Sequence, residues 1–293
     1  MKKIIVISGP TASGKTDLSI ELAIFFQGEI INADSVQIYK KFDIGSAKAT
    51  AEELEKVKHH LLNKIEPEDS YNIYNFQKDV RSLITQIKTP FLVGGSGLYI
   101  KAALFDYELI PENKSLHHII QTNNLSIKQI LQTIKQKDPD LIIDTKNHRR
   151  IISAYKQIIQ NNLRSQKTGK NIPLFDILFF YLDTPKNILK ERLVLRLEQM
   201  LKKGFIEEVE YLMQYYPKAS LNIIGYREIK DFLEKKINLK DAKNLIIRNS
   251  LKYAKRQKTW FKNQIPSLQI INTLNENWKE QIFQKTQKFL KKE

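Results

Sequence analysis

A run of eight residues near the N-terminus has the types and spacing of a phosphate-binding loop, because it fits the pattern G-x-x-x-x-G-K-[ST]. In such loops, glycines let backbone N–H groups converge on phosphate oxygens, and the lysine adds a positive charge. The Thr16 hydroxyl can hold Mg²⁺. We therefore expect the run to bind a di- or triphosphate together with Mg²⁺. Its members are Gly9, Pro10, Thr11, Ala12, Ser13, Gly14, Lys15 and Thr16.

The segments on either side of this loop must position it. Residues 3–8 are apolar and mostly β-branched, which predicts a buried strand. Residues 17–26 carry apolar side chains at helical spacing. A helix that begins directly after the loop directs the positive end of its dipole at the phosphate. Strand, turn and helix in this order distinguish the motif from a chance match in a solvated turn.

A carboxylate and a second glycine-rich loop follow two further predicted strands. Residues 29–32 lead into Asp34, and residues 90–93 lead into the loop at 94–99. Ligands of open α/β sheets gather at the carboxyl ends of the strands. Asp34 is therefore expected where a catalytic acid or base would lie, with turn capping or water-mediated metal binding as alternatives. Two glycine-rich loops at strand ends indicate one shared cleft.

The amino-acid composition of the chain changes between residues 112 and 173. This stretch is polar and rich in Asn, Gln and Lys, with no strand pattern, and helices are expected over 126–137 and 149–163. An apolar, aromatic-rich strand over 175–182 then returns the chain to the sheet. We therefore predict a helical insertion at 112–173.

The domain organisation follows from that insertion. We predict an α/β fold in which residues 1–111 and 174–293 together form a parallel sheet flanked by helices. A helix is also expected over 51–62. It would contain the adjacent His59 and His60, which have no matching metal ligands and for which we favour a structural role.

Basic residues exceed acidic ones, 48 Lys and Arg against 32 Asp and Glu, which leaves a formal net charge of +16. The excess favours a polyanionic partner, nucleic acid first, although lysine on solvated faces is the alternative. A long helix expected over 239–261 interleaves basic residues with Tyr253, Trp260 and Phe261, which suits a phosphate backbone with exposed bases.

Two absences in the sequence narrow the classes further. There is no cysteine, which excludes disulfides, a thiol nucleophile and Cys-based zinc sites. No apolar run approaches the length of a membrane span. We expect a soluble, cytoplasmic monomer with no membrane partner.

In the order of its motifs, the sequence resembles the tRNA dimethylallyltransferase (isopentenyl-tRNA transferase) family. The resemblance spans nearly the whole chain and rests on GPTASGKT at 9–16, DSVQIY at 34–39, GSAK at 45–48, GGSGLY at 94–99, GYRE at 225–228 and AKRQKTWF at 254–261. It implies a P-loop NTPase-like sheet. It also implies transfer of a five-carbon allyl group from dimethylallyl diphosphate to the exocyclic amine of the adenosine 3′ of a tRNA anticodon.

The resemblance implies roles for individual residues as well. Asp34 would be the general base, Arg196 would reach the diphosphate, and Thr11 would contact substrate across the cleft. The phosphate loop would hold the departing diphosphate instead of transferring a phosphoryl group. Contacts with the tRNA anticodon stem-loop are implied for Asp34, Ser35, Val36, Gln37, Ser96, Arg149, Arg150, Gly225, Tyr226, Arg227, Lys255, Arg256, Gln257 and Trp260.

Four positions depart from the family's usual pattern, and all bear on RNA affinity rather than on the phosphate and base machinery. Ala49 stands where proline is common, and Leu251 where an arginine follows threonine. Ser153 and His118 stand where arginines are expected.

Three other functions are alternatives to the one that the resemblance implies. A relative that prenylates free adenine nucleotides would share the phosphate loop and the aspartate, and a nucleoside or nucleotide kinase would share the loop and paired arginines. A nucleic-acid-binding NTPase without transfer chemistry is disfavoured, because no apolar strand ends in a Walker-B acidic pair.

Overall fold

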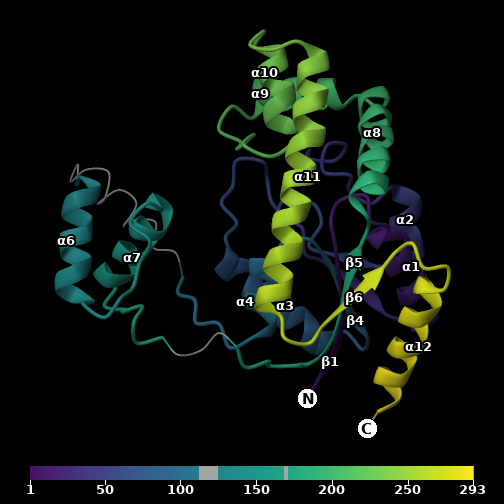
Figure 1. The fold of residues 1–293 in the computed structure, drawn as a ribbon, viewed down its shortest axis with the longest axis horizontal. Helices are drawn as coiled ribbons and strands as arrows, with labels where there is room; N and C mark the ends of the chain where they lie inside the picture. The colour runs from purple at the N-terminus through teal and green to yellow at the C-terminus, as the bar shows by residue number, and fades with distance from the viewer. Residues whose placement is uncertain (112–124, 168–170, 293) are drawn as a thin grey trace.

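A six-stranded sheet lies at the centre of the computed structural model, which describes residues 1–111, 125–167 and 171–292 (Figure 1). The strand order is β3-β2-β4-β1-β5-β6, and every neighbouring pair runs parallel. This confirms the predicted fold class. The strands are β1 (Lys3–Ser8), β2 (Glu29–Asn32), β3 (His59–His60), β4 (Pro90–Gly94), β5 (Asp176–Asp183) and β6 (Leu268–Asn272).

Helices connect these strands and cover both faces of the sheet. Among the described residues they are α1 (Lys15–Phe25), α2 (Ala51–Lys56), α3 (Ile73–Gln86), α4 (Gly97–Leu104), α6 (Ile127–Lys137), α7 (His148–Ile159), α8 (Lys186–Lys202), α9 (Phe205–Tyr215), α10 (Tyr226–Leu233), α11 (Leu239–Gln264) and α12 (Trp278–Lys291). No helix within the described ranges is both long and apolar enough to cross a membrane.

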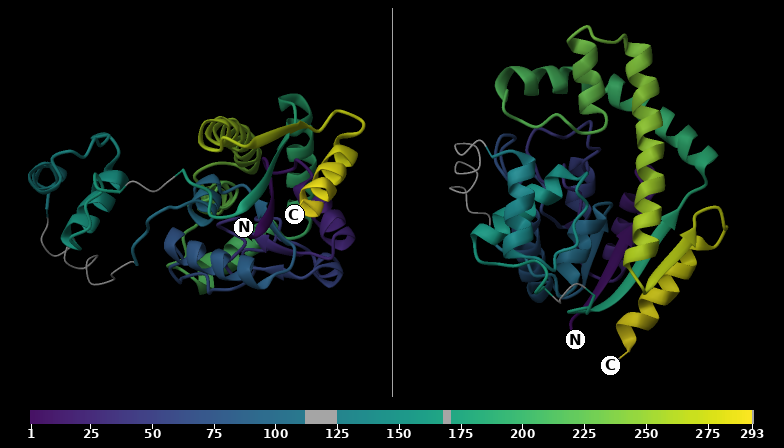
Figure 2. Two further views of the ribbon diagram at one scale, coloured as in Figure 1. Left: turned by 90° about the horizontal axis from the view of Figure 1, so that it is seen from below. Right: turned by 60° about the vertical axis from the view of Figure 1, so that its left-hand side comes forward.

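The central strands are buried on both faces, so they read as continuous apolar runs rather than alternating ones. Along β1, Ile5 and Ile7 face a core that α1 and α12 complete. Ile4 and Val6 face the opposite core, which is completed by α3, α4 and α11. Figure 2 shows this layered arrangement from two further sides.

Two helical groups lie outside these layers. The first consists of α9 and α10 with the parts of α8 and α11 that pack on them; it has its own core around Phe205, Val209 and Tyr226 and stands at the top of Figure 1. The second, α6 with α7, packs through Ile130 and Ile151 and lies apart from the sheet at the left of Figure 1. The chain leaves and re-enters the sheet at one place, where Phe105 and Pro173 form an antiparallel bridge.

The structure corrects the prediction for residues 51–62. The helix α2 ends at Lys56, and His59 and His60 form the edge strand β3, which pairs with β2. Sheet pairing overrides the local helical pattern here, because Ile30 N donates to Lys58 O at 2.9 Å and His60 Nε2 lies 2.6 Å from Glu29 Oε2. Both histidines therefore take part in holding the edge of the sheet, which agrees with the structural role favoured for them.

One strand bears on the expectation that no apolar strand ends in a Walker-B acidic pair. The strand β5 is apolar and ends in an acid, Asp183. This carboxylate is engaged by Lys258 of α11, with Asp183 Oδ2 2.6 Å from Lys258 Nζ. It is a single acid tied to a helix, not an acidic pair.

Candidate active site and nucleic-acid interface

The phosphate loop joins the end of β1 to the start of α1. Helix α1 has no side-chain cap at its N-terminus, where Gly14 precedes Lys15. Its first backbone N–H groups therefore point into the loop, the arrangement that binds anions. Lys15 Nζ folds back to donate to Pro10 O at 2.7 Å. Thr11 and Thr16 lie exposed at the rim of the loop.

Positive charge is crowded at this loop. Burial and, to a smaller extent, the nearby charge of Arg196 together lower the pKa of Lys15 to about 7, against the opposing effect of Asp34. Burial likewise lowers the pKa of the Arg196 guanidinium, and Asp34 again opposes the shift. From the same flank of α8, Arg192 Nη1 reaches Ala12 O at 3.5 Å. An anion bound here would relieve the repulsion between Lys15 and Arg196.

Asp34 follows the end of β2 and is held by a turn. Its N–H donates to Asn32 Oδ1 at 3.2 Å, and its Oδ1 accepts from Val36 N at 2.8 Å. The turn-capping alternative is thus realised, but only by one carboxylate oxygen. Within the part of the chain that the structure describes, no donor hydrogen-bonds Oδ2, so this oxygen is available to a ligand.

The second glycine-rich loop is a packing junction between this turn and α11. Ser96 N donates to Ala33 O at 3.2 Å, and Ser96 Oγ accepts from Ser35 N at 3.3 Å. A Cβ on Gly97 would lie 2.4 Å from the Trp260 ring, so only glycine allows this approach. A Cβ on Gly95 would lie 3.5 Å from Gly9 O, which places the two loops side by side, as one shared cleft requires.

Gln257 and Trp260, two of the expected RNA contacts, face this junction. Gln257 is buried and its Nε2 donates to Gly95 O at 2.9 Å. Its Oε1 is buried without a hydrogen-bond partner among the described residues. Trp260 is half-buried against Gly97 and Phe261. Both side chains therefore fix α11 to the sheet.

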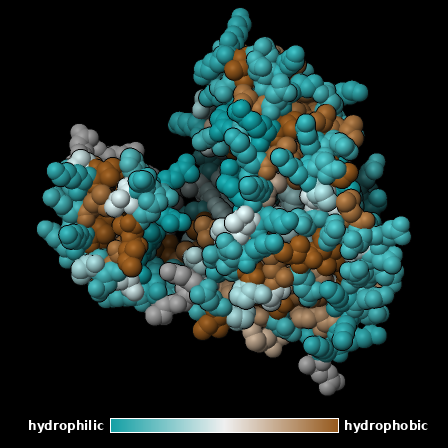
Figure 3. Space-filling view, viewed as in Figure 1, coloured by the Kyte–Doolittle hydropathy of each residue, from teal (hydrophilic) through white to brown (hydrophobic). Residues whose placement is uncertain are grey.

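The exposed side of α11 carries the expected cations. Lys255 and Arg256 are exposed, and the Arg256 guanidinium lies 5.7 Å from the centre of the Tyr253 ring. Burial raises the pKa of Tyr253, and the charge of Asp34 raises it further, so the tyrosine lies near the aspartate. No local pattern predicts that these two residues are neighbours, because 219 positions separate them in the chain. Figure 3 shows this face of the molecule as mostly hydrophilic.

The structure corrects the role expected for Tyr226. Its side chain is completely buried and its hydroxyl donates to Glu208 Oε1 at 2.7 Å, so it cannot reach RNA in this arrangement. Gly225 is also buried, and its N–H donates to Glu228. Arg227 is exposed but paired with Glu228, at 2.6 Å. This motif holds α10 in place.

Arg149 and Arg150 are exposed at the start of α7, away from the phosphate loop (Figure 1). Ser153, which departs from the family pattern, accepts a 2.8 Å hydrogen bond from Arg164 Nη2. A guanidinium therefore still lies beside this turn of α7. His118 lies outside the described residues.

Ala49 and Leu251, two further positions that depart from the family pattern, lie in different parts of the structure. Ala49 is half-buried directly before Thr50, whose hydroxyl caps α2. Leu251 is half-buried on α11, two residues before Tyr253. Neither position disturbs the phosphate loop.

Comparisons with known proteins agree with this geometry. The family model for IPP transferase matches residues 37–264. A tRNA dimethylallyltransferase of Phytoplasma australiense is 53% identical over 292 residues, which cover 100% of this chain and 99% of the relative. That of Acholeplasma laidlawii is 52% identical over 265 residues, 90% of this chain and 91% of the relative.

Solved structures are similar over the same length. A tRNA isopentenylpyrophosphate transferase from Bacillus halodurans matches with a TM-score of 0.73 at 31% identity, covering 99% of this chain and 97% of the other. A eukaryotic dimethylallyltransferase acting on tRNA matches with a TM-score of 0.78 at 27% identity, covering 94% and 76%. Family model, relatives and fold agree with the motif order, and the chain therefore belongs to the IPP transferase family.

Proposed function

We propose that this protein transfers a dimethylallyl group from dimethylallyl diphosphate to the exocyclic amine of the adenosine 3′ of the anticodon in tRNA, releasing diphosphate. The observation that carries the proposal is the convergence of Lys15, Arg196 and Asp34 at the carboxyl edge of the sheet. Two cations and a carboxylate in one cleft suit a reaction in which an anion leaves and a proton is removed.

The leaving group of this reaction is a diphosphate. The N–H groups at the start of α1, Lys15 and Arg196 would stabilise negative charge as it builds on the departing oxygen. Arg192, which reaches the loop backbone, would position the loop from α8. Thr11, exposed at the rim, would contact substrate from the other side.

The acceptor amine is a poor nucleophile and must lose a proton. Asp34 Oδ2 is the available oxygen of a carboxylate whose orientation is fixed through Val36. In this role Asp34 is the general base. The target adenosine has to leave its stack to reach it, as in other base-modifying enzymes.

Mg²⁺ fits the site as an ion carried largely by the substrate. The described residues contain no cluster of three or more metal-ligating side chains. Mg²⁺ is commonly held by one or two protein ligands together with substrate phosphates, and the exposed Thr16 hydroxyl supplies one such ligand. When bound, the ion would neutralise charge on the diphosphate.

RNA would lie across α11 and the turn that follows β2. Lys255 and Arg256 would contact backbone, while Ser35, Gln37 and Ser96 line the turn next to Asp34. Arg149 and Arg150 would contribute from α7, across the hollow that Figure 3 shows between the α6–α7 unit and the main body. We propose that the enzyme acts as a monomer. Because the acceptor is tRNA, we place the reaction in the cytoplasm.

The test uses purified protein with labelled dimethylallyl diphosphate, Mg²⁺ and three acceptors: an anticodon stem-loop, the same stem-loop with its target adenosine replaced, and AMP. We expect label only on the unaltered stem-loop, and competition by pyrophosphate. Label on AMP alone would favour the nucleotide prenyltransferase. RNA-stimulated ATP hydrolysis without prenyl transfer would overturn the proposal.

A further inference from the structure

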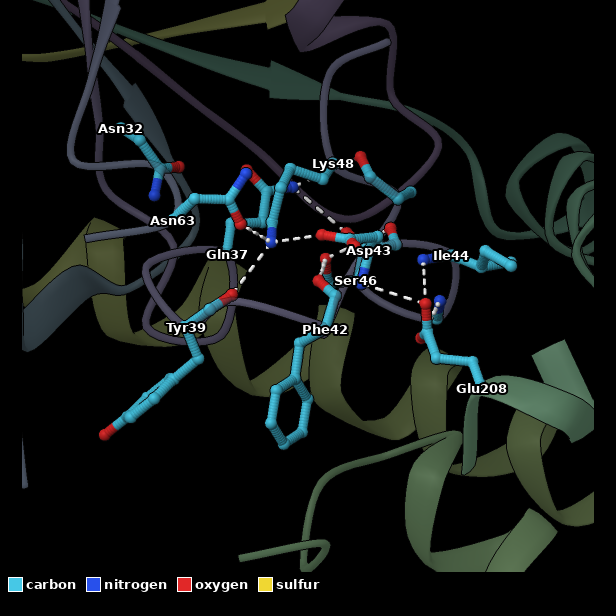
Figure 4. A network of polar contacts seen from close by, with 12 residues as sticks. Asn32, Gln37, Tyr39, Phe42, Asp43, Ile44, Ser46, Lys48, Asn63 and Glu208 are labelled. Atoms are coloured by element: carbon cyan, nitrogen blue, oxygen red, sulfur yellow. Dashed lines mark hydrogen bonds and ion pairs between the residues drawn. The ribbon is translucent and has the colours of Figure 1, made fainter. Parts of the chain in front are cut away.

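A loop next to the proposed active site is held by a carboxylate that the transfer reaction does not use. Glu208 of α9 accepts hydrogen bonds from three consecutive backbone N–H groups, at 3.0 Å from Asp43, 2.6 Å from Ile44 and 3.0 Å from Gly45 (Figure 4). The Tyr226 hydroxyl supplies a fourth, at 2.7 Å. A carboxylate that accepts several such bonds is strongly fixed in place.

The loop is shaped to receive this carboxylate. A Cβ on Gly45 would lie 2.0 Å from the Phe205 ring, so glycine is needed for the loop to approach α9 so closely. Lys48, whose side chain is only 4% exposed, closes the other side of the loop. Its Nζ donates to Tyr39 O at 2.8 Å, and to Asp43 Oδ1 and Asn63 Oδ1, both at 2.6 Å. All three donors of the ammonium are used.

The loop in turn fixes Gln37, a proposed RNA contact. Gln37 Nε2 donates to Ser46 O at 3.0 Å and to Ala47 O at 3.2 Å. The backbone of Gln37 is held as well, since its carbonyl accepts from Asn63 N at 3.3 Å. Figure 4 shows Gln37, Lys48 and Glu208 as parts of one polar network.

We propose that Glu208 is a positioning residue for the acceptor RNA, which acts by holding the loop at 42–48 and through it the amide of Gln37. This inference rests on the proposed function, because it concerns how the RNA is recognised. The Gln37 amide is committed to two loop carbonyls, so its Oε1 is presented in a set direction. An acceptor with a set direction can select for an amine on a base edge, whereas a mobile one loses this selectivity to conformational freedom.

Glu208→Gln is the direct test. A carboxamide places an N–H₂ where a second acceptor oxygen was, so it faces donors with a donor. We expect kcat/KM for the anticodon stem-loop to fall about 10- to 100-fold, mostly through KM, because hydrogen bonds to a charged group are lost. The KM for dimethylallyl diphosphate should stay unchanged. Glu210→Gln, an exposed position on the same helix, is the matched control.

A double-mutant cycle separates positioning from general support of the fold. If Glu208 acts through Gln37, then Glu208→Gln should cost less than about twofold in a Gln37→Ala background. Full additivity would overturn the inference. Tyr226→Phe removes one hydrogen bond to Glu208 and keeps the aromatic packing. Its effect should be smaller and should likewise disappear in the Gln37→Ala background. If Glu208→Gln does not fold, the cycle with Tyr226→Phe tests the inference in its place.

The parent protein provides the remaining distinction. If the parent transfers no prenyl group to the stem-loop, the proposed function fails. If the parent is active and the cycle is additive, only the role of Glu208 fails.

Discussion

The two working regions of this protein are built in opposite ways. In the proposed cleft, Lys15 at the start of α1, Asp34 after β2 and Arg196 on α8 lie partly buried, close enough to perturb one another electrostatically. On the RNA side, Lys255 and Arg256 project from α11 into solvent. Under the proposed function, the partly buried residues would serve turnover and the exposed ones would serve RNA affinity.

The physical reason is the local environment of the charges. Interactions between partly buried groups are strong and little affected by salt, whereas exposed charges are screened within about 8–10 Å at ordinary ionic strength. Variants in the cleft should therefore change rate without changing RNA affinity. Variants on the exposed side of α11 should do the reverse.

The largest effect is expected from Asp34→Asn. The amide keeps the shape of the side chain and its bond to Val36 N, but lacks basicity. Turnover should fall by about 10²–10⁴, while tRNA and pyrophosphate affinities survive to within a few-fold. Single-turnover assays and equilibrium binding measure the two properties separately. If high Mg²⁺ restored the turnover of Asp34→Asn, Asp34 would instead be a metal-binding residue, and the assignment of a general base to the cleft would be wrong.

Lys15→Gln should be next in size. It removes one cation from the proposed leaving-group site, and loss of one such stabilising group costs about 10²–10³ in rate. Pyrophosphate should also bind more weakly by calorimetry, because less positive charge remains beside Arg196. Lys190→Gln, an exposed lysine on α8, is the control. Unchanged pyrophosphate affinity in Lys15→Gln would contradict the assignment of the loop.

The double variant Lys255→Ala/Arg256→Ala tests the exposed side of α11. Stem-loop affinity should fall, and the slope of log K against log salt should flatten by about two, one unit for each lost phosphate contact. The turnover rate at saturating RNA should equal that of the parent protein. The pair Lys288→Ala/Lys291→Ala removes the same charge from α12. Equal losses in both double variants would mean that only net charge matters.

The smallest effect should come from Glu228, which links α10 to α11 behind the RNA side. Burial raises the pKa of this carboxyl, but hydrogen bonds from Arg227, Gly225 N and Asn249 outweigh it and lower the pKa below its ordinary value of 4.5. These bonds therefore stabilise the fold above about pH 4.5, and the stabilisation is lost as pH falls through the folded-state pKa.

Glu228→Gln should accordingly lower the free energy of unfolding by about 1–3 kcal/mol at pH 7. The deficit should shrink as the pH falls below 4.5. Denaturant titrations at several pH values measure it, and a deficit that did not vary with pH would refute the account. Pyrophosphate affinity should be unaffected, because Glu228 supports the fold and does not belong to the proposed active site.

Local patterns in the sequence were sufficient for most elements of this fold. The β-branched run before the phosphate loop, the capping box at Ser126 and the long helix that contains Lys255 were all predicted, and the structure confirms them. Each depends on periodicity or on side chains within four residues of one another. The family was predicted for a related reason, since its motifs are short contiguous runs.

Long-range packing decided the rest. Pairing with β2 made His59 and His60 a strand, which no local pattern indicates. The approach of α9 and α10 to the loop at 42–48 buried Tyr226 and gave Glu208 its partners. Sequence spacing carries no information about contacts between residues more than 160 positions apart. Only the closed tertiary structure, in which parallel strand ends meet at one edge, brings such residues together.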